Sequence, residues 1–129
     1  MAYKNFTVDV DGDGIALVTW NMPDRSMNVF SADVMTELSD IVDKISADAN
    51  VKGVVVTSGK DTFSGGADLT MLETMGDTFM KLVKEKGEEA ANKFLFEQSS
   101  AMSRTYRKLE TSGKPWVAAV NGTAMGGAF

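Results

Sequence analysis

SGGADL at residues 64–69 and GTAMGGAF at residues 122–129 are the two stretches of this sequence that decide the fold. Each follows an apolar run, VKGVVVTS at 51–58 and KPWVAAV at 114–120, and consists mainly of small residues. Small residues let a backbone approach a ligand closely, and a turn that opens a helix leaves its first N–H groups without intrahelical partners. Either turn alone is explained by a tight strand-to-helix connection. Two such turns side by side could direct two backbone donors at one oxygen atom.

We call residues 64–69 the first glycine turn and residues 122–129 the second glycine turn. Hydrophobic periodicity predicts the secondary structure of the rest of the chain. Apolar residues alternate on both sides of DGDG at 11–14, which predicts an antiparallel hairpin over 6–20. Ser31 is a candidate N-cap for an amphipathic helix that ends near Ala47.

The rest of the chain predicts one more strand, a long helical stretch and a final strand. The β-branched run at 51–58 is typical of a strand buried on both faces. Residues 69–110 are helix formers, with possible interruptions at Gly76 and Gly87, and KPWVAAV predicts a second short buried strand. The order β-β-α-β-α-β indicates an α/β protein.

Composition excludes several classes of function. The chain has 129 residues, a net charge of -5 and a pI near 4.6, which fits one domain and argues against nucleic-acid binding. The absence of cysteine and histidine excludes disulfides, thiolate nucleophiles, Ser-His-Asp triads and histidine-based metal sites. No apolar run is long enough to span a membrane and the N-terminus lacks a signal-peptide profile, so we expect a cytoplasmic protein.

Two other patterns have simpler explanations. DVDGDG at 9–14 matches the start of a calcium-binding loop, but Trp20 stands where a bidentate Glu should close it, so we interpret it as an acidic hairpin turn. The nine methionines are interpreted as core filler, although flexible thioethers would also suit a pocket for varied acyl chains.

Taken together, the motifs resemble the enoyl-CoA hydratase/isomerase (crotonase) superfamily. The resemblance includes NMPDRSMNVFS at 21–31, the strand at 51–58 and both glycine turns. It implies a crotonase-like spiral of ββα turns, with residues 1–129 forming the N-terminal part of a single domain that is truncated before it is complete. The implied substrate is an acyl or enoyl thioester of coenzyme A, with no cofactor and no metal.

The resemblance also implies roles for individual residues. Ala67 and Gly127 match the two backbone N–H donors of an oxyanion hole for the thioester carbonyl. The remaining expected substrate contacts are the backbone at Gly65 and Gly66, the flanking Asp68 and Gly126, and Arg25 facing the phosphates of coenzyme A. For Asp68 and Glu73 we favour helix-capping and first-turn dipole roles over catalysis.

In family hydratases the catalytic glutamates lie beyond the position of Phe129, so this chain is expected to be inactive alone. The charged helical insertion at 76–98 resembles the hydratase region that begins multifunctional β-oxidation proteins, where a 3-hydroxyacyl-CoA dehydrogenase follows. Ala128, which replaces a common third glycine, is a small departure. The expected function is that of an enoyl-CoA hydratase, a lyase, in a homo-oligomer or a multifunctional complex. The alternatives are an isomerase, a thioester hydrolase, or a non-catalytic acyl-CoA-binding or assembly module.

Overall fold

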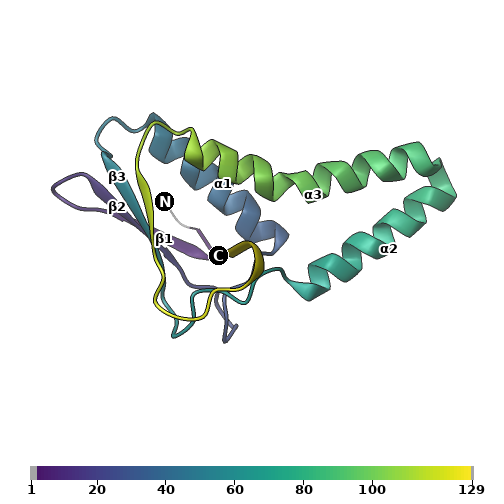
Figure 1. Ribbon diagram of the computed structural model, residues 1–129, viewed down its shortest axis with the longest axis horizontal. Coiled ribbons are helices and arrows are strands. Elements are labelled where there is room, and N and C mark those ends of the chain that lie inside the picture. Colours follow the sequence, from purple (N-terminus) through teal and green to yellow (C-terminus); the bar gives the residue numbers. More distant parts are fainter. Residues whose placement is uncertain (1–2, 129) are drawn as a thin grey trace.

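A computed structural model describes residues 3–128 and confirms a mixed α/β fold (Figure 1). The elements are β1 (Phe6–Val10), β2 (Ile15–Trp20), α1 (Ala32–Ala47), β3 (Gly53–Ser58), α2 (Leu69–Lys86), α3 (Glu88–Glu110), β4 (Trp116–Ala119) and a short 3-10 helix (Gly126–Ala128). Phe129, the last residue of the second glycine turn, lies outside the described residues.

The predicted hairpin is confirmed, because β1 and β2 pair antiparallel across the acidic turn. The Asp11 carboxylate accepts the N–H groups of Asp13 at 3.0 Å and Ile15 at 2.8 Å. Gly14 completes the turn with a φ of 84°. These bonds support the interpretation of DGDG as a hairpin turn.

The predicted helix α1 is also confirmed. The Ser31 hydroxyl accepts the Val34 N–H at 3.3 Å, which caps the first turn. The helix buries its apolar stripe, Val34, Leu38, Ile41, Val42 and Ile45, against one face of the sheet. That face contributes Ala16, Val18 and Trp20 from β2, and together these residues form the core.

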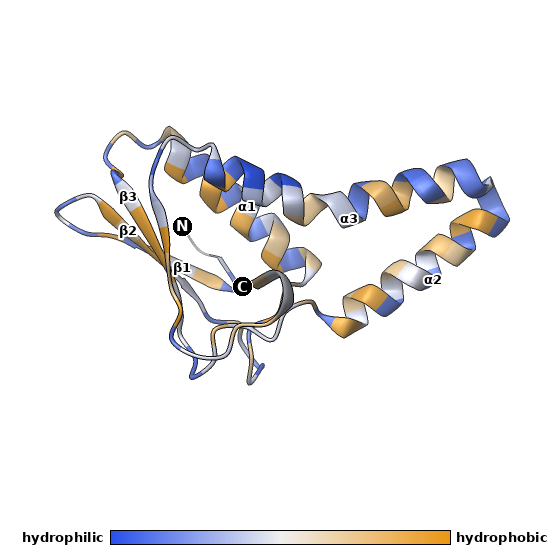
Figure 2. Cartoon of the chain, in the orientation of Figure 1, coloured by the Kyte–Doolittle hydropathy of each residue, from blue (hydrophilic) through white to orange (hydrophobic). Residues whose placement is uncertain are grey.

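The sheet has the order β1-β2-β3-β4, with β3 parallel to both β2 and β4. The prediction that β3 and the 114–120 run are buried on both faces is wrong. Val55 in β3 is only half-buried, and its neighbours Leu17 and Val117 are 41% and 58% exposed. The helices lie on one face of the sheet (Figure 1), and strands of the sheet include hydrophobic stretches (Figure 2). Within residues 3–128, no helix covers the other face, so Leu17 and Val117 are exposed there.

The helical stretch over 69–110 forms a hairpin that extends away from the sheet (Figure 1). Its break is at Gly87, where φ is 88°, whereas Gly76 lies inside α2 without interrupting it. No residue of α2 is buried, and α3 buries only Ala91 and Thr105.

The core-filler interpretation of the methionines is right only in part. Met22 is buried in the core and Met102 packs against it, but Met80 of α2 is 56% exposed. Within residues 3–128, no helix combines the length and the hydropathy required to cross a membrane.

Candidate functional site

Three segments that are distant in the sequence meet at one edge of the molecule: the loop at 21–30 and the two glycine turns. The first glycine turn lies between the other two segments. Phe30 pairs with Ala67 on one side, and Ser64 pairs with Ala124 on the other, both in parallel. The structure therefore brings the two glycine turns side by side, as the sequence suggested.

Asn28, which is completely buried, holds the first glycine turn against the ends of two strands. Its Nδ2 donates to the Trp20 carbonyl and to the Ser58 hydroxyl, each at 2.9 Å. Its Oδ1 accepts the Met22 N–H at 3.0 Å, and its backbone carbonyl accepts the Gly65 N–H at 2.8 Å. A buried amide with this many partners fixes all the segments that it joins.

Sequence reasoning did not assign a role to Asn28. The residue lies in the 21–31 motif, but its partners come from β2, β3 and the first glycine turn. The repeated asparagine of that motif, Asn21 and Asn28, is the signal that could have drawn attention to it.

The direction of the Ala67 N–H follows from the backbone pairing around it. Phe30 N–H donates to the Gly66 carbonyl at 2.8 Å, and Asp68 N–H donates to the Phe30 carbonyl at 3.0 Å. The Gly66 carbonyl and the Ala67 N–H belong to one trans peptide, so they point in opposite directions. The Ala67 N–H is therefore directed away from Phe30, and the second glycine turn lies on that other side of the first.

The contact between the turns requires a glycine at position 66. Gly66 has a φ of 89°, which L side chains rarely adopt, and it is buried. A Cβ at this position would be 3.1 Å from the Met125 carbonyl oxygen and 3.8 Å from the Gly126 Cα. The two backbones therefore approach each other closely.

The second glycine turn is bonded to the first and is more exposed. Met125 N–H donates to the Ser64 carbonyl at 3.1 Å, and Ala128 N–H donates to the Met125 carbonyl at 3.2 Å. Gly126 and Gly127 are both exposed. Among the described residues, neither the Ala67 N–H nor the Gly127 N–H donates a hydrogen bond to a protein acceptor. Both amides are thus free to bind a ligand atom.

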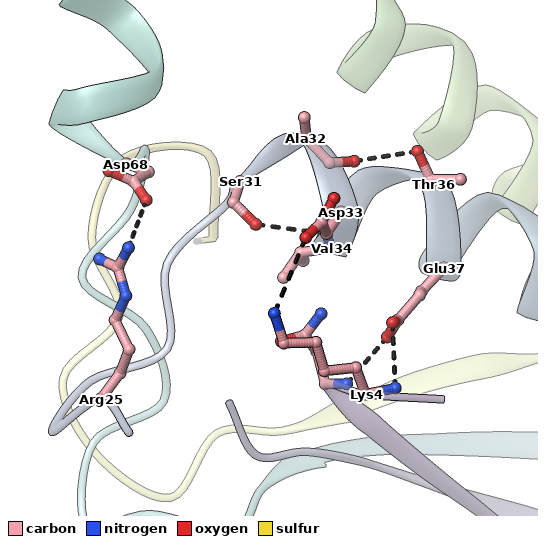
Figure 3. A network of polar contacts seen from close by, with 10 residues as sticks. Lys4, Arg25, Ser31, Ala32, Asp33, Val34, Thr36, Glu37 and Asp68 are labelled. Atoms are coloured by element: carbon pink, nitrogen blue, oxygen red, sulfur yellow. Dashed lines mark hydrogen bonds and ion pairs between the residues drawn. The ribbon is translucent and has the colours of Figure 1, made fainter. Parts of the chain in front are cut away.

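Asp68 is the N-cap of α2, as predicted. One carboxylate oxygen accepts the Thr70 N–H at 2.9 Å, and the other accepts the Arg25 guanidinium at 2.9 Å (Figure 3). The Asp68 side chain is 8% exposed and that of Arg25 is 47% exposed. Arg25 is therefore tied to the first glycine turn with one side open, and its contact with phosphates stays a prediction.

The first-turn role expected for Glu73 is wrong. Helix α2 begins at Leu69, so Glu73 lies in the second helical turn, and the first turn of α2 contains no acidic residue.

A cavity of about 650 Å³ lies elsewhere, between α1 and α3. Its lining includes Ser39 and Asp43 of α1 with Arg104 and Lys108 of α3. None of the predicted site residues lines it. The Lys108 ammonium contacts the Asp43 carboxylate at 2.6 Å, so the charges in this cavity compensate each other.

The sequence of this chain matches one family model and is similar to several curated proteins. The family model described as enoyl-CoA hydratase/isomerase matches residues 11–129. The fatty acid oxidation complex subunit alpha of Shewanella frigidimarina is 38% identical over 125 residues, which cover 96% of this chain and 16% of that protein. The chain therefore spans only a small part of the curated relative's length.

Two solved structures are similar over most of this chain. An enoyl-CoA hydratase from Bacillus anthracis matches with a TM-score of 0.70 and 26% identity, covering 96% of this chain and 42% of that one. A monofunctional enoyl CoA isomerase from M. smegmatis matches with a TM-score of 0.67 and 25% identity, covering 97% of this chain and 44% of that one.

Proposed function

Because the chain belongs to the enoyl-CoA hydratase/isomerase family, we propose that it is the N-terminal part of an enoyl-CoA hydratase of fatty acid oxidation. The enzyme would add water across the double bond of a trans-2-enoyl-CoA. This reaction places negative charge on the thioester carbonyl oxygen in its transition state.

One observation carries this proposal: the two glycine turns touch, and the N–H groups of Ala67 and Gly127 have no acceptor within residues 3–128. Two donors directed at one oxygen form an oxyanion hole, which stabilises charge that develops during the reaction. Removing one such donor typically costs about 3 to 4 kcal/mol of transition-state stabilisation.

The same turns would bind the coenzyme A part of the substrate. The backbone at Gly65, Gly66 and Gly126 would contact this part of the substrate, and Arg25 could turn its exposed side toward phosphate groups. Arg25 is paired with Asp68, so a phosphate would have to share the guanidinium with that carboxylate.

The acid and base of the reaction are expected from outside this chain. Asp68 directly follows Ala67, and its two carboxylate oxygens already accept hydrogen bonds from the Arg25 guanidinium and the Thr70 N–H. It is therefore poorly suited to move a proton. We propose that glutamates in a longer protein supply this step, and that residues 1–129 alone do not turn over substrate.

The relative from Shewanella frigidimarina is named as a subunit of a fatty acid oxidation complex. By analogy, the protein that contains this chain would act in the cytoplasm as part of a multifunctional complex or as a homo-oligomer.

Hydration of crotonyl-CoA tests the proposal, because loss of the conjugated double bond is followed directly by ultraviolet absorbance. The chain of 129 residues and the natural chain extended beyond it are assayed together. We expect activity only in the extended chain. Hydration by the short chain would refute the placement of the acid and base.

The donor assignment is tested in the extended chain by Gly127→Pro, which removes the N–H. We expect kcat to fall by about a hundredfold or more. Gly127→Ala is the matched control because it keeps the N–H. Equal turnover in Gly127→Pro and the unmodified protein would refute the role of Gly127.

Isomerase activity is the second candidate, favoured by the similarity to the M. smegmatis isomerase. An oxyanion hole also serves a double-bond shift, since that reaction passes through an enolate. Conversion of a 3-enoyl-CoA to the 2-enoyl isomer, without hydration of crotonyl-CoA, would favour this alternative.

A further inference from the structure

Helix α3 contacts the second glycine turn through two side chains. The Tyr106 hydroxyl donates to the Gly127 carbonyl at 2.5 Å. The Met102 sulfur lies 2.7 Å from the point that a Cβ on Gly127 would occupy. Helix α3 thus restrains Gly127, the residue that carries the second proposed donor.

The ring of Tyr106 reaches the first glycine turn as well. It packs edge to face against Phe30, with ring centroids 6.3 Å apart and an interplanar angle of 76°. The Phe30 backbone is bonded on both sides of Ala67, to the Gly66 carbonyl and to the Asp68 N–H. A single side chain therefore connects the segment that holds the first proposed donor with the turn that holds the second.

This connection matters most for the second turn. The Gly127 carbonyl belongs to the peptide that follows its N–H, so a bond to this carbonyl restrains rotation of the residue. Gly127 is exposed and has no side chain to anchor it. Burial raises the pKa of Tyr106, so its phenol remains a protonated donor at physiological pH.

We infer that Tyr106 is a positioning residue that sets the spacing between the two backbone donors, through its hydroxyl at Gly127 and its ring at Phe30. The inference rests on the proposed function. It adds a side chain of the helical hairpin to the two backbone donors.

Tyr106→Phe tests the inference in the extended chain, because it removes the hydroxyl and keeps the ring against Phe30. Tyr3→Phe is the matched control, since Tyr3 is the other tyrosine of the chain and its hydroxyl donates to Asp40 at 2.6 Å, on α1. We expect Tyr106→Phe to lower kcat about tenfold with KM within about twofold, and Tyr3→Phe to change neither.

A second measurement reports donor geometry without turnover. Bound acetoacetyl-CoA ionises to an enolate with its own ultraviolet absorbance, and the two donors favour that ionised form. We expect the pH of half-ionisation of the bound ligand to rise in Tyr106→Phe and to remain unchanged in Tyr3→Phe.

The outcomes separate the two proposals. If the unmodified extended chain hydrates crotonyl-CoA and Tyr106→Phe matches it in kcat and in enolate ionisation, the inference on Tyr106 is wrong and the proposed function stands. A fall in thermal stability with unchanged kcat also overturns the inference, because it indicates a merely structural bond. If the unmodified chain neither hydrates crotonyl-CoA nor binds acetoacetyl-CoA, the proposed function fails and the role of Tyr106 fails with it.

Discussion

The two glycine turns have similar sequences but are held in different ways. The first is buried at Ser64, Gly66 and Asp68 and is bonded on one side to the buried residues Asn28 and Phe30. The second is mostly exposed; it is bonded to the backbone of Phe63 and Ser64, and its Gly127 contacts α3. The segment around the first proposed donor is thus held by buried partners, whereas Gly127, which carries the second, is restrained by a helix.

The most damaging change to the first turn should be Asn28→Ala. It leaves the buried Met22 N–H without an acceptor and removes one of the hydrogen bonds of the Trp20 carbonyl and one of those of the Ser58 hydroxyl. We expect a loss of about 3 to 4 kcal/mol in the free energy of unfolding, measured by urea denaturation. Asn50→Ala, at an exposed asparagine, should cost far less, and an equal loss in both variants would contradict the central role of Asn28.

Gly66→Ala should be the next most costly change. It forces an alanine into a φ of 89° and brings its Cβ to 3.1 Å from the Met125 carbonyl. We expect a loss of about 2 kcal/mol in thermal or chemical denaturation. Gly76→Ala is the control, since a Cβ at this position inside α2 would have no neighbour within 4 Å, and it should stabilise by about 0.5 to 1 kcal/mol. Destabilisation by both changes would show that the strain is not specific to the first turn.

Asp68→Ala should weaken the first turn at its junction with α2. The change removes the N-cap bond to Thr70 and the partner of Arg25. We expect a loss of about 1 kcal/mol, mainly from the cap, and a smaller loss for Arg25→Gln because the guanidinium is half exposed. Circular dichroism during thermal unfolding measures both variants. A larger effect of Arg25→Gln would mean that the ion pair, not the cap, holds this junction.

A double-mutant cycle on Gly127 and Met102 examines the second turn. The added Cβ of Gly127→Ala would meet the end of a flexible methionine, so the cost should be below about 1 kcal/mol. In Met102→Ala the same change should cost nothing, which gives a coupling energy of about 0.5 to 1 kcal/mol. If the cycle gives no coupling, Met102 does not press on this turn.

Tyr3, Asp40 and Lys44 form a hydrogen-bonded cluster at α1 that, within residues 3–128, makes no hydrogen bond to either glycine turn. A change in this cluster serves as the reference for changes in the turns. Hydrogen bonds from Lys44 and then Tyr3 lower the pKa of Asp40, and the bond to Asp40 raises the pKa of Lys44. The stability contributed by Asp40 is present above its unfolded pKa near 3.8 and is lost as pH falls through the lower folded value. The stability contributed by Lys44 is present below its unfolded pKa of 10.5 and is lost as pH rises through the higher folded pKa.

The melting temperature of Lys44→Met should therefore be slightly lower than that of the unmodified protein at neutral pH, and the difference should shrink as Asp40 is protonated in acid and as Lys44 is deprotonated in alkali. Hydration by the extended chain should not change. A difference that does not shrink in acid would contradict the assignment to Asp40.

Local sequence was sufficient for the hairpin, for α1 with its Ser31 cap, and for the Asp68 cap of α2. These features depend on residues a few positions apart. Burial of β3 and β4 could not be predicted, because a β-branched run does not reveal whether one or both faces of its sheet are covered. The roles of Asn28 and Tyr106 also depend on distant partners, Ser58 at 30 residues from Asn28 and Gly127 at 21 residues from Tyr106, so no local pattern contains them.

The free end of the α2–α3 hairpin has an evolutionary consequence. Both ends of the hairpin are anchored, by Asp68 at the start and by Tyr106 near the close, whereas a Cβ on Gly87 at the tip would have no neighbour within 4 Å. Residues could be gained or lost at the tip over generations without moving either anchor. Related proteins could thus differ in the length of the α2–α3 hairpin while the two glycine turns at its base stay the same.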